Sequence, residues 1–300
     1  MMLSPIVLFV YNRLDHTVKT VESLQKNLLA MDSEIIVYSD AAKDTNVINQ
    51  VNKVRDYISS IKGFKKITII ERPKNFGLAN SIIDGVTTIV NKYGKIIVLE
   101  DDLVTSPYFL NFMNEALEFY KNERDVCSIT GFNYPFKIKS NYKFESYLYP
   151  RCSSKSWATW KHKWEKVEFN ENEIINKWSL SKIECKVEPY GKDLCRMFRS
   201  QLNHKINSWA IRFAVNQIML EKYTAYPIKS YVKDIGDDSG THANNSLPHK
   251  VVVSNELLVN FANQYDDNFR KLYNKYLRRY FLKSRLYIVR NKIKNIFFGG

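Results

Sequence analysis

The sequence predicts an α/β protein built on a mostly parallel sheet that helices cover on both faces. Over residues 1–133, short apolar runs alternate with segments in which apolar residues recur at helical spacing. The apolar runs are continuous, which is typical of strands buried on both faces of a Rossmann-like sheet. With 300 residues, 45% hydrophobic and 25% charged, the chain can form one large domain with a C-terminal elaboration.

Four strands are expected in the first part, at Ile6–Val10, Glu34–Asp40, Lys66–Pro73 and Lys95–Asp102. The first helix is expected to begin at Asp15, which can cap it. The third helix lies between Gly77 and Gly94, and a fourth has Pro107 at its first position. The apolar faces of the first three helices are Val18, Val21, Leu24 and Leu28; Val51, Val54, Ile58 and Ile61; and Ile82, Ile83, Val86, Ile89 and Val90.

Polar residues follow each predicted strand at the point where the strand ends. Asn12 and Arg13 follow the first strand, Asp40 the second and Arg72 the third, and the acidic triplet 100–102 closes the fourth. Parallel strands place their carboxyl ends at one edge of the sheet, and ligands of such sheets bind beyond that edge. The sequence therefore predicts a functional site at the carboxyl edge.

The acidic triplet, Glu100, Asp101 and Asp102, requires a positive partner, because like charges repel and each carboxylate resists leaving water. Carboxylates suit hard cations such as Mg²⁺ or Mn²⁺, which keep water and bridge phosphates. Successive side chains of a strand point in opposite directions, so the three carboxylates face one point only if the strand breaks at Asp101. The opposing interpretation is a solvated acidic turn.

The pattern changes after residue 133. Aromatic islands, SWATWKHKW at 156–164 and NSWAIRF at 207–213, alternate with polar stretches up to residue 254. Tryptophans such as Trp157, Trp160 and Trp164 more often pack in a core than form a platform for a sugar. Residues 255–300 are basic and aromatic at helical spacing, which predicts a C-terminal helical region. The expected divisions are 1–133, 134–254 and 255–300, with the first two forming halves of one domain.

The net charge of +14 favours anionic partners, namely nucleotides, nucleic acid or an acidic membrane surface. Basic residues concentrate in the C-terminal region, where Phe269, Leu272, Tyr276 and Tyr280 alternate with Lys and Arg. This pattern favours a basic amphipathic helix on an anionic membrane over a packed helix with a solvated basic face. A groove-reading or stacking motif for nucleic acid is missing, so no nucleic-acid partner is expected.

The cysteines and the N-terminus indicate a reducing compartment. None of the four cysteines forms a CxxC pair, which argues against a zinc knuckle or a redox motif. The N-terminus has no basic n-region of a signal peptide, and no apolar run has the length of a membrane span. The chain is therefore expected in the cytoplasm, peripheral at the inner face of the cell membrane.

Four stretches together carry a resemblance: FVYNR, VYSDAAKD, ERPKNFGLANSI and VLEDDL. In this order, and at predicted strand ends, they resemble the nucleotide-sugar half of a GT-A fold glycosyltransferase, with EDD in the place of the metal-binding DxD element. The EDD form and the later aromatic blocks are similar to the inverting N-acetylglucosaminyltransferases and to bacterial family 2-type enzymes of surface polysaccharide assembly. The resemblance implies a nucleotide-sugar-binding half at 1–133 and an acceptor-side half at 134–254.

The resemblance implies a role for each matched residue. Asp102 would hold Mn²⁺ or Mg²⁺, and Asp101 would lie at the ribose or the sugar. Asn12 and Arg13 would lie near the diphosphate, and Asp40 would contact the uracil or the ribose. The base and ribose pocket would be shaped by Arg72, Asn75 and Gly77, the last allowing close backbone approach.

The general base is where the sequence departs from the resembled enzymes. An inverting enzyme needs a base to deprotonate the acceptor hydroxyl, and similar enzymes use an Asp just before a Trp. This chain has Asn207 and Ser208 before its Trp, and neither side chain is a useful base. Either the correspondence is shifted, or the base is Asp237 or Asp238, or the chain is impaired. We favour Asp238 in the loop GDDSGTH, with His242 touching the metal or the diphosphate.

These observations predict a metal-dependent, inverting glycosyltransferase that moves a sugar from a UDP-sugar to a glycan or lipid-linked acceptor in surface polysaccharide synthesis. A sugar-phosphate nucleotidyltransferase is the rival enzyme class, but it needs a Gly-rich loop where this chain has FVYNRLDHT. Two further hypotheses are a catalytically impaired relative of the glycosyltransferases and a basic nucleic-acid-binding protein.

Overall fold

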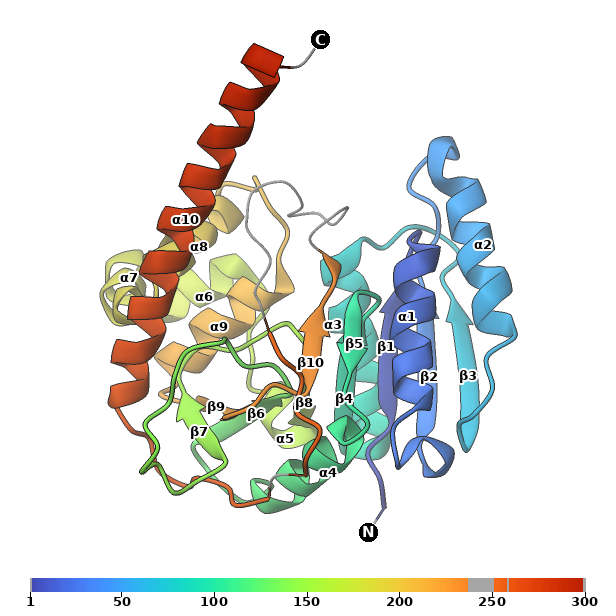
Figure 1. Ribbon diagram of the computed structural model, residues 1–300, viewed down its shortest axis with the longest axis horizontal. Helices are drawn as coiled ribbons and strands as arrows, with labels where there is room; N and C mark the ends of the chain where they lie inside the picture. The colour runs from blue at the N-terminus through green and yellow to red at the C-terminus, as the bar shows by residue number, and fades with distance from the viewer. Residues whose placement is uncertain (1, 237–250, 258, 299–300) are drawn as a thin grey trace.

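The computed structural model describes residues 2–236, 251–257 and 259–298, and these residues form one eight-stranded sheet at the centre of the molecule (Figure 1). The strands lie in the order β3-β2-β1-β4-β8-β6-β9-β7. Of these described strands, β7 and β8 run against the other six. The strands are Ile6–Val10 (β1), Glu34–Ser39 (β2), Lys66–Glu71 (β3), Lys95–Glu100 (β4), Val126–Thr130 (β6), Ser146–Tyr149 (β7), Trp157–Trp160 (β8) and Tyr223–Pro227 (β9).

Helices cover both faces of the sheet, as the sequence predicts. Residues of α1, α2 and α4 share one apolar cluster with β1, β2 and β4, and residues of α3, α5 and α9 form a second cluster on the opposite face. A third cluster joins α6, α7 and α8 to the outside of α9. The helices are Leu14–Gln25 (α1), Ile48–Ser59 (α2), Leu78–Tyr93 (α3), Phe109–Phe119 (α4), Lys161–Trp164 (α5), Glu171–Lys177 (α6), Leu180–Val187 (α7), Lys192–Leu202 (α8), Trp209–Met219 (α9) and Asn268–Phe298 (α10).

The end of the fourth strand differs from the prediction. β4 stops at Glu100 rather than at Asp102, and a turn leads into the short strand β5, Leu103–Thr105. β5 pairs antiparallel with β10, Val232–Asp234, outside the main sheet. Because the strand breaks at Asp101, the acidic side chains are not forced to alternate between the two faces.

Three predicted helix boundaries are also wrong. α1 begins at Leu14, so Asp15 lies in its first turn and no side chain caps it. The same helix ends at Gln25, which leaves Leu28 outside the helix and 60% exposed. α4 begins at Phe109, two residues after Pro107. Helix boundaries depend on the backbone hydrogen bonds of a few residues, which apolar spacing does not specify.

The glycines predicted to bound α3 do so. Gly77 has φ +70° at the residue before the helix, and Gly94 ends the helix in the left-handed conformation with φ +78°. Both values lie where a side chain is strained, so glycine is required at both positions.

The aromatic islands belong to the core, as expected for tryptophans at such positions. Trp157 is 2% exposed and stacks on Trp209 with ring centroids 4.8 Å apart. Trp164 is also buried, and its indole donates to Thr87. β7, β8 and β9 from the stretch after residue 133, together with β6 just before it, continue the sheet that β1 to β4 begin.

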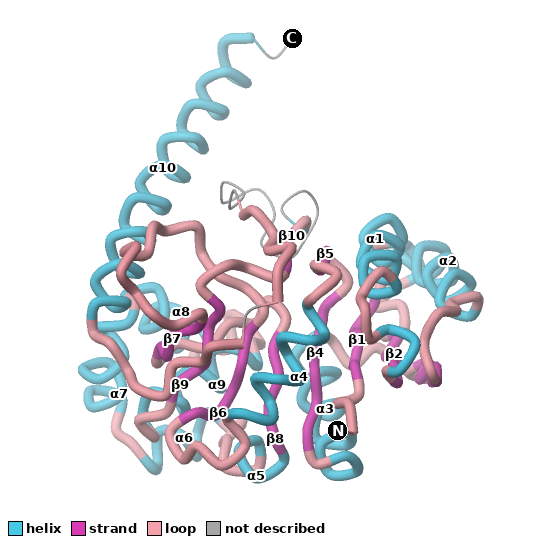
Figure 2. Tube along the Cα trace, turned by 60° about the horizontal axis from the view of Figure 1, so that its bottom comes forward, coloured by secondary structure: helices cyan, strands magenta, loops and turns pink. Residues whose placement is uncertain are grey.

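The C-terminal helix α10 starts against the body of the protein and then leaves it (Figures 1 and 2). Phe269, Tyr273 and Leu277 from its first turns pack in a cluster with Tyr147, Tyr149 and Tyr226. Within the described part of the chain, no helix combines the length and apolar character needed to cross a bilayer.

Candidate active site at the carboxyl edge

Arg13 joins the end of β1 to the acidic turn after β4. Its Nη2 donates to Asp102 Oδ2 at 2.8 Å and also contacts Asp101 Oδ1. Asp101 is 4% exposed, whereas the Asp102 side chain is 22% exposed. The structure therefore places a cation from the chain itself between two of the three acids that the sequence singles out.

Burial and neighbouring charges shift the pKa of Glu100, Asp101 and Arg13 at this turn. Burial and the neighbouring charges of Asp102 and Asp101 raise the pKa of Glu100 to about 8. Burial also raises the pKa of Asp101, although the Arg13 guanidinium opposes that effect. For Arg13, burial disfavours the charged form, but Asp101 and Asp102 outweigh it and raise the pKa. Negative charge at this turn is therefore costly unless a cation is present.

A distant segment of the chain passes over the acidic turn. The N–H of Ile235 donates to the Asp102 carbonyl at 2.9 Å, and the ring Nε2 of His16 lies 3.1 Å from the Ile235 carbonyl oxygen. Asp234 forms an ion pair with Lys155. Gly236 lies so close to the Asp102 carboxylate that a Cβ there would collide with it. Because the segment passes this close to Asp102, position 236 has no room for a side chain.

Asp40, at the end of β2, organises the loop that precedes α3. Its Oδ1 accepts from the N–H groups of Ala41 and Phe76, both at 2.9 Å. Its Oδ2 accepts from the Gly77 N–H at 2.9 Å and from Asn75 Nδ2 at 3.3 Å. Asp40 from one predicted motif is therefore brought together with Asn75 and Gly77 from another, and the carboxylate orders the backbone of the loop.

Arg72 lies beside the same loop. Its guanidinium pairs with Asp84 at 2.5 Å and lies over the rings of Tyr38 and Phe76, 4.7 and 4.3 Å from their centroids. Its Nε is buried without a hydrogen-bond partner among the described residues. Asn12, the remaining residue predicted near the diphosphate, is partly buried just after β1. These residues lie on neighbouring strands, β1 to β4, at their carboxyl ends.

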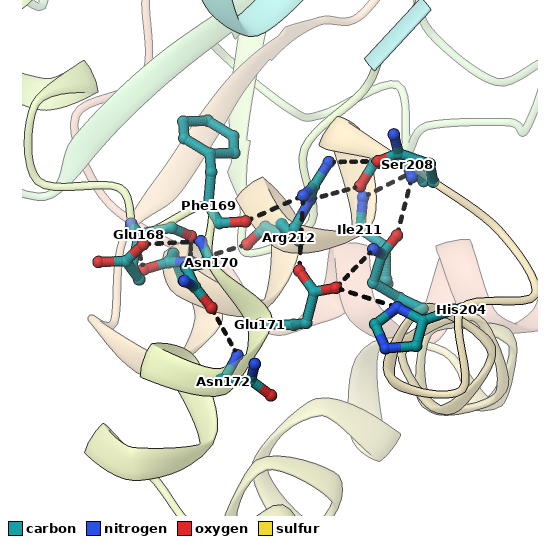
Figure 3. A network of polar contacts seen from close by, with 12 residues as sticks. Glu168, Phe169, Asn170, Glu171, Asn172, His204, Ser208, Ile211 and Arg212 are labelled. Carbon is teal, nitrogen blue, oxygen red and sulfur yellow. Dashed lines mark hydrogen bonds and ion pairs between the residues drawn. The ribbon is translucent and has the colours of Figure 1, made fainter. Parts of the chain in front are cut away.

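Asp237, Asp238 and His242 lie outside the described residues. Asn207 and Ser208 stand where an acid was expected, directly before α9. Ser208 is the residue that caps the helix (Figure 3). Asn207 Oδ1 accepts from Arg212 Nη2 at 2.8 Å, and Ser208 Oγ accepts from the Ile211 N–H. Both side chains thus serve the local structure of the helix.

Arg212 connects Asn207 to a carboxylate that the sequence did not single out. Its Nη1 lies 3.6 Å from Glu171 Oε2, and His204 Nδ1 lies 3.7 Å from Glu171 Oε1 (Figure 3). A polar hollow of about 380 Å³ opens here. It is lined by Asn80, Glu171, Gln201, His204, Lys205, Ile206, Asn207 and Arg212. No local motif marks Glu171, because its partners lie more than 30 residues away.

Other site residues were also missed by sequence reasoning. Asp234 on β10 pairs with Lys155, which precedes β8, and His16 on α1 contacts the Ile235 carbonyl in the segment that passes over the acidic turn. The sequence signal is indirect, in that Asp234 lies two residues before the predicted base loop and Lys155 directly precedes the tryptophan island. Contacts between segments that lie so far apart in the sequence cannot be predicted from the spacing of residues within each segment.

The acidic turn fits one kind of metal site. Among residues 2–236, 251–257 and 259–298, no group of three His, Cys, Asp or Glu side chains converges to hold a metal. The partly exposed Asp102 can offer a carboxylate to a hard cation whose other ligands are water and phosphate oxygens, which is how Mg²⁺ is commonly bound. The turn does not fit a closed site made of protein ligands alone.

Solved structures with similarity to this chain include two forms of TarS from S. aureus. TarS shares 10% identity over 78% of this chain and 37% of its own, with a TM-score of 0.41. TarS 1–349 in complex with UDP-GlcNAc shares 10% identity over 77% and 58%, with a TM-score of 0.42. The chain thus spans well under half the length of the longer TarS chain.

A third similar structure is the mannosyltransferase PcManGT from Pyrobaculum calidifontis in complex with GDP-Man and Mn²⁺. It shares 12% identity over 73% of this chain and 75% of its own, with a TM-score of 0.39. None of the curated proteins compared with the chain matches it.

The family model described as "Glycosyl transferase family 2" matches residues 6–201, which is more than half of the chain. The matched range runs from β1 to α8 and contains the acidic turn, the Asp40 loop and Arg13. The chain therefore belongs to glycosyl transferase family 2 and has the GT-A arrangement of sheet and helices.

Proposed function

We propose that the protein is a metal-dependent, inverting glycosyltransferase that takes its sugar from a UDP-sugar. The observation that carries this proposal is the partly exposed carboxylate of Asp102, beside Arg13, at the same sheet edge as the loop that Asp40 orders. A cation site and a backbone loop at one edge suit a nucleoside diphosphate, whose phosphates need positive charge and whose base and ribose need a shaped wall.

Each residue has a distinct part in the proposed reaction. Asp102 would hold Mn²⁺ or Mg²⁺, which supplies charge stabilisation for the departing diphosphate. Arg13 and Asn12 would bind the diphosphate, and Asp101, buried beside Arg13, would hold the guanidinium in position. Contact of Asp101 with the ribose or sugar stays a prediction.

The nucleoside would lie against the Asp40 loop. Arg72 and Phe76 already stack there, and the backbone of Gly77 has no Cβ to keep a ribose away. Because the Asp40 carboxylate already accepts four hydrogen bonds within the protein, its proposed contact with uracil or ribose would add to an existing positioning role.

The acceptor hydroxyl needs a base, and we propose Asp238, with Asp237 as the second choice and His242 toward the metal or diphosphate. Gly236, the last described residue before this loop, lies against Asp102, which supports a base loop close to the cation. The acceptor would be a glycan or lipid-linked saccharide in surface polysaccharide synthesis, reached from the cytoplasm at the inner face of the membrane. No nucleic-acid partner is proposed.

The test is calorimetric titration with UDP, with and without Mn²⁺, followed by UDP-GlcNAc, other UDP-sugars and GDP-Man. We expect UDP to bind more tightly with Mn²⁺ present and the Asp102→Ala variant to lose that dependence while keeping its melting temperature. Glu118→Gln, which changes a partly exposed acid on α4, is the matched control and should leave UDP binding unchanged. Unchanged metal dependence in Asp102→Ala would overturn the proposed metal site.

A catalytically impaired glycosyltransferase is the second candidate, and Asn207 is the observation that favours it. The two candidates differ in one measurement. If Asp238 is the base, Asp238→Asn loses sugar transfer or donor hydrolysis but keeps UDP binding. If the chain is impaired, the unchanged protein binds UDP and turns over none of the donors.

A further inference from the structure

The polar hollow beside α9 has no part in the proposed donor site, yet it has the features of a binding site. Its walls include Asn80 on α3, Glu171 on α6, Gln201 on α8 and Arg212 on α9. Apolar contacts hold α6, α8 and α9 together around it. Its volume of about 380 Å³ lies within the roughly 300–1,000 Å³ of typical small-molecule sites. Of the described residues that line it, all but Ile206 are polar, so the hollow suits a polar ligand.

Glu171 offers the hollow a carboxylate that is held in place but not saturated with hydrogen bonds. Its side chain is 15% exposed and lies between Arg212 and His204 (Figure 3). The nitrogens of these two side chains are 3.6 and 3.7 Å from the carboxylate oxygens, which is too far for good hydrogen bonds, and Gln201 Nε2 is 3.4 Å away. A carboxylate has about four positions at which it can accept a hydrogen bond. Glu171 can therefore accept hydrogen bonds from a ligand in the hollow.

Arg212 balances the charge of Glu171 from within the wall. It is 7% exposed, and its guanidinium donates to the carbonyls of Ser208 and Phe169 at 3.1 and 2.9 Å and to Asn207 Oδ1 at 2.8 Å. Burial lowers the pKa of Arg212, and the Glu171 carboxylate opposes that effect. Because the guanidinium is buried and donates to groups of the protein, it neutralises Glu171 without presenting its charge to an anionic ligand.

Asn207 supplies a hydrogen-bond donor to the same hollow. A guanidinium only donates, so the amide oxygen of Asn207 faces Arg212 and its NH₂ group points away from it. Asn207 is exposed where it lines the hollow, and its NH₂ group donates to none of the described residues. An aspartate at this position would lack the donor. The asparagine therefore has a use at a position where an acid was expected.

We propose that the polar hollow binds an uncharged saccharide, the acceptor sugar, whose hydroxyl groups donate to Glu171 and accept from Asn207. A hydroxyl combines both hydrogen-bonding roles without carrying charge. A phosphate or a uronic acid is disfavoured, because the Glu171 carboxylate repels it and the Arg212 guanidinium is already engaged. Lys205 also lines the hollow, but it is exposed, so that solvent screens its charge.

The hollow adjoins the loop against which the nucleoside is proposed to lie. Asn80, on the α3 wall, donates to the Phe76 carbonyl at 3.1 Å, and the Phe76 N–H donates to Asp40. α3 and α9 also share the apolar cluster on this face of the sheet. A saccharide in the hollow would therefore lie beside the donor, as an acceptor sugar must. This assignment to the acceptor rests on the proposed function, whereas the match of hydrogen-bonding groups does not.

The experiment is saturation transfer difference NMR of the full chain with the methyl glycosides of glucose, galactose, mannose and N-acetylglucosamine. The methyl glycosides of glucuronic and galacturonic acid serve as charged counterparts with the same rings. We expect at least one neutral glycoside to bind, and each uronide to bind more weakly than its neutral counterpart.

Two variants connect binding to the hollow. Glu171→Gln should weaken binding of the neutral glycoside about tenfold, because hydrogen bonds to a charged acceptor become neutral ones. Asn207→Asp keeps the oxygen that faces Arg212 and removes the NH₂ donor, so it should weaken binding severalfold at an unchanged melting temperature. Glu173→Gln, which changes an exposed acid on the same helix as Glu171, is the matched control and should leave binding unchanged.

Three results would overturn the proposal: no binding of any neutral glycoside, equal binding by Glu171→Gln and the unchanged protein, or tighter binding of a uronide than of its neutral counterpart. Displacement of the glycoside by UDP-GlcNAc would overturn its assignment to the acceptor. A chain that binds the glycoside through Glu171 but does not bind UDP would keep the saccharide site and count against the proposed function instead.

Discussion

Replacing Arg13 should have opposite effects on the binding of two ligands, Mn²⁺ and UDP. Its guanidinium already occupies the cation position of the acidic turn, in contact with both Asp101 and Asp102. A metal ion that binds Asp102 without nucleotide must therefore displace Arg13. When a diphosphate is present, Arg13 gains a second anionic partner and the displacement is offset. Arg13→Gln should thus strengthen binding of Mn²⁺ alone and weaken binding of UDP alone.

The magnitude follows from the geometry of the pair. Unit charges about 4 Å apart attract by about 4 kcal/mol at an effective dielectric constant near 20. The Arg13 and Asp102 side chains are 18% and 22% exposed, so solvent and desolvation cancel much of this attraction. A net contribution of about 1.4 kcal/mol corresponds to about tenfold in affinity. We therefore expect Mn²⁺ alone to bind about tenfold more tightly to Arg13→Gln than to the unchanged protein.

The assay is the electron paramagnetic resonance signal of free Mn²⁺ during titration of the protein without nucleotide, together with calorimetry of UDP without metal. Arg55→Gln is a suitable control, because Arg55 pairs with Glu71 near the same edge but does not contact the acidic turn. If Arg13→Gln binds Mn²⁺ no better than the unchanged protein does, Arg13 is not a competitor of the metal and the reasoning is refuted.

Two further predictions concern stability. Asp40→Ala should lower the free energy of unfolding by about 2–3 kcal/mol and weaken UDP binding, since the backbone donors of the 75–77 loop lose their acceptor; urea denaturation and calorimetry measure both effects. Burial disfavours the ionised form of Asp193, but the Arg151 guanidinium outweighs burial and lowers the pKa of Asp193 from its ordinary value of 3.8. The ion pair therefore stabilises the fold fully above the pKa of Asp193 in the unfolded chain, and this stabilisation is lost as the pH falls through the lower pKa of the folded state. Asp193→Asn should cost about 3 kcal/mol at pH 7, with the difference shrinking in denaturation curves measured toward pH 3.

The sheet and its carboxyl edge could be predicted because local sequence determines them. In continuous apolar runs such as 6–10 and 96–99, all side chains are buried only if the run forms a strand covered on both faces. Because these strands are parallel, the residues at their carboxyl ends, Arg13, Asp40 and Asp102, lie at one edge of the sheet. The positions of Gly77 and Gly94 at the two ends of α3 could be predicted for a similar reason, since both residues have a positive φ that strains other residues.

Contacts between distant segments could not be predicted in this way. The spacing of Phe269, Tyr273 and Leu277 continues without a break to Phe281, yet the first three are buried and Phe281 is exposed. The exposure differs because Tyr147 and Tyr149 pack against only the first turns of α10. These tyrosines lie more than 100 residues away in the sequence. A deletion of the residues after 266 would therefore remove part of the core.

The acidic triplet shows how burial divides roles among residues that look equivalent in sequence. Glu100 closes the strand, and its raised pKa of about 8 means that it resists ionisation near neutral pH. Asp101 is buried beside Arg13 and fixes the guanidinium. Asp102 combines solvent exposure with a charged neighbour that a diphosphate could draw away. Because an incoming cation needs a carboxylate that it can reach, we propose the partly exposed Asp102 as the acid that exchanges Arg13 for a metal.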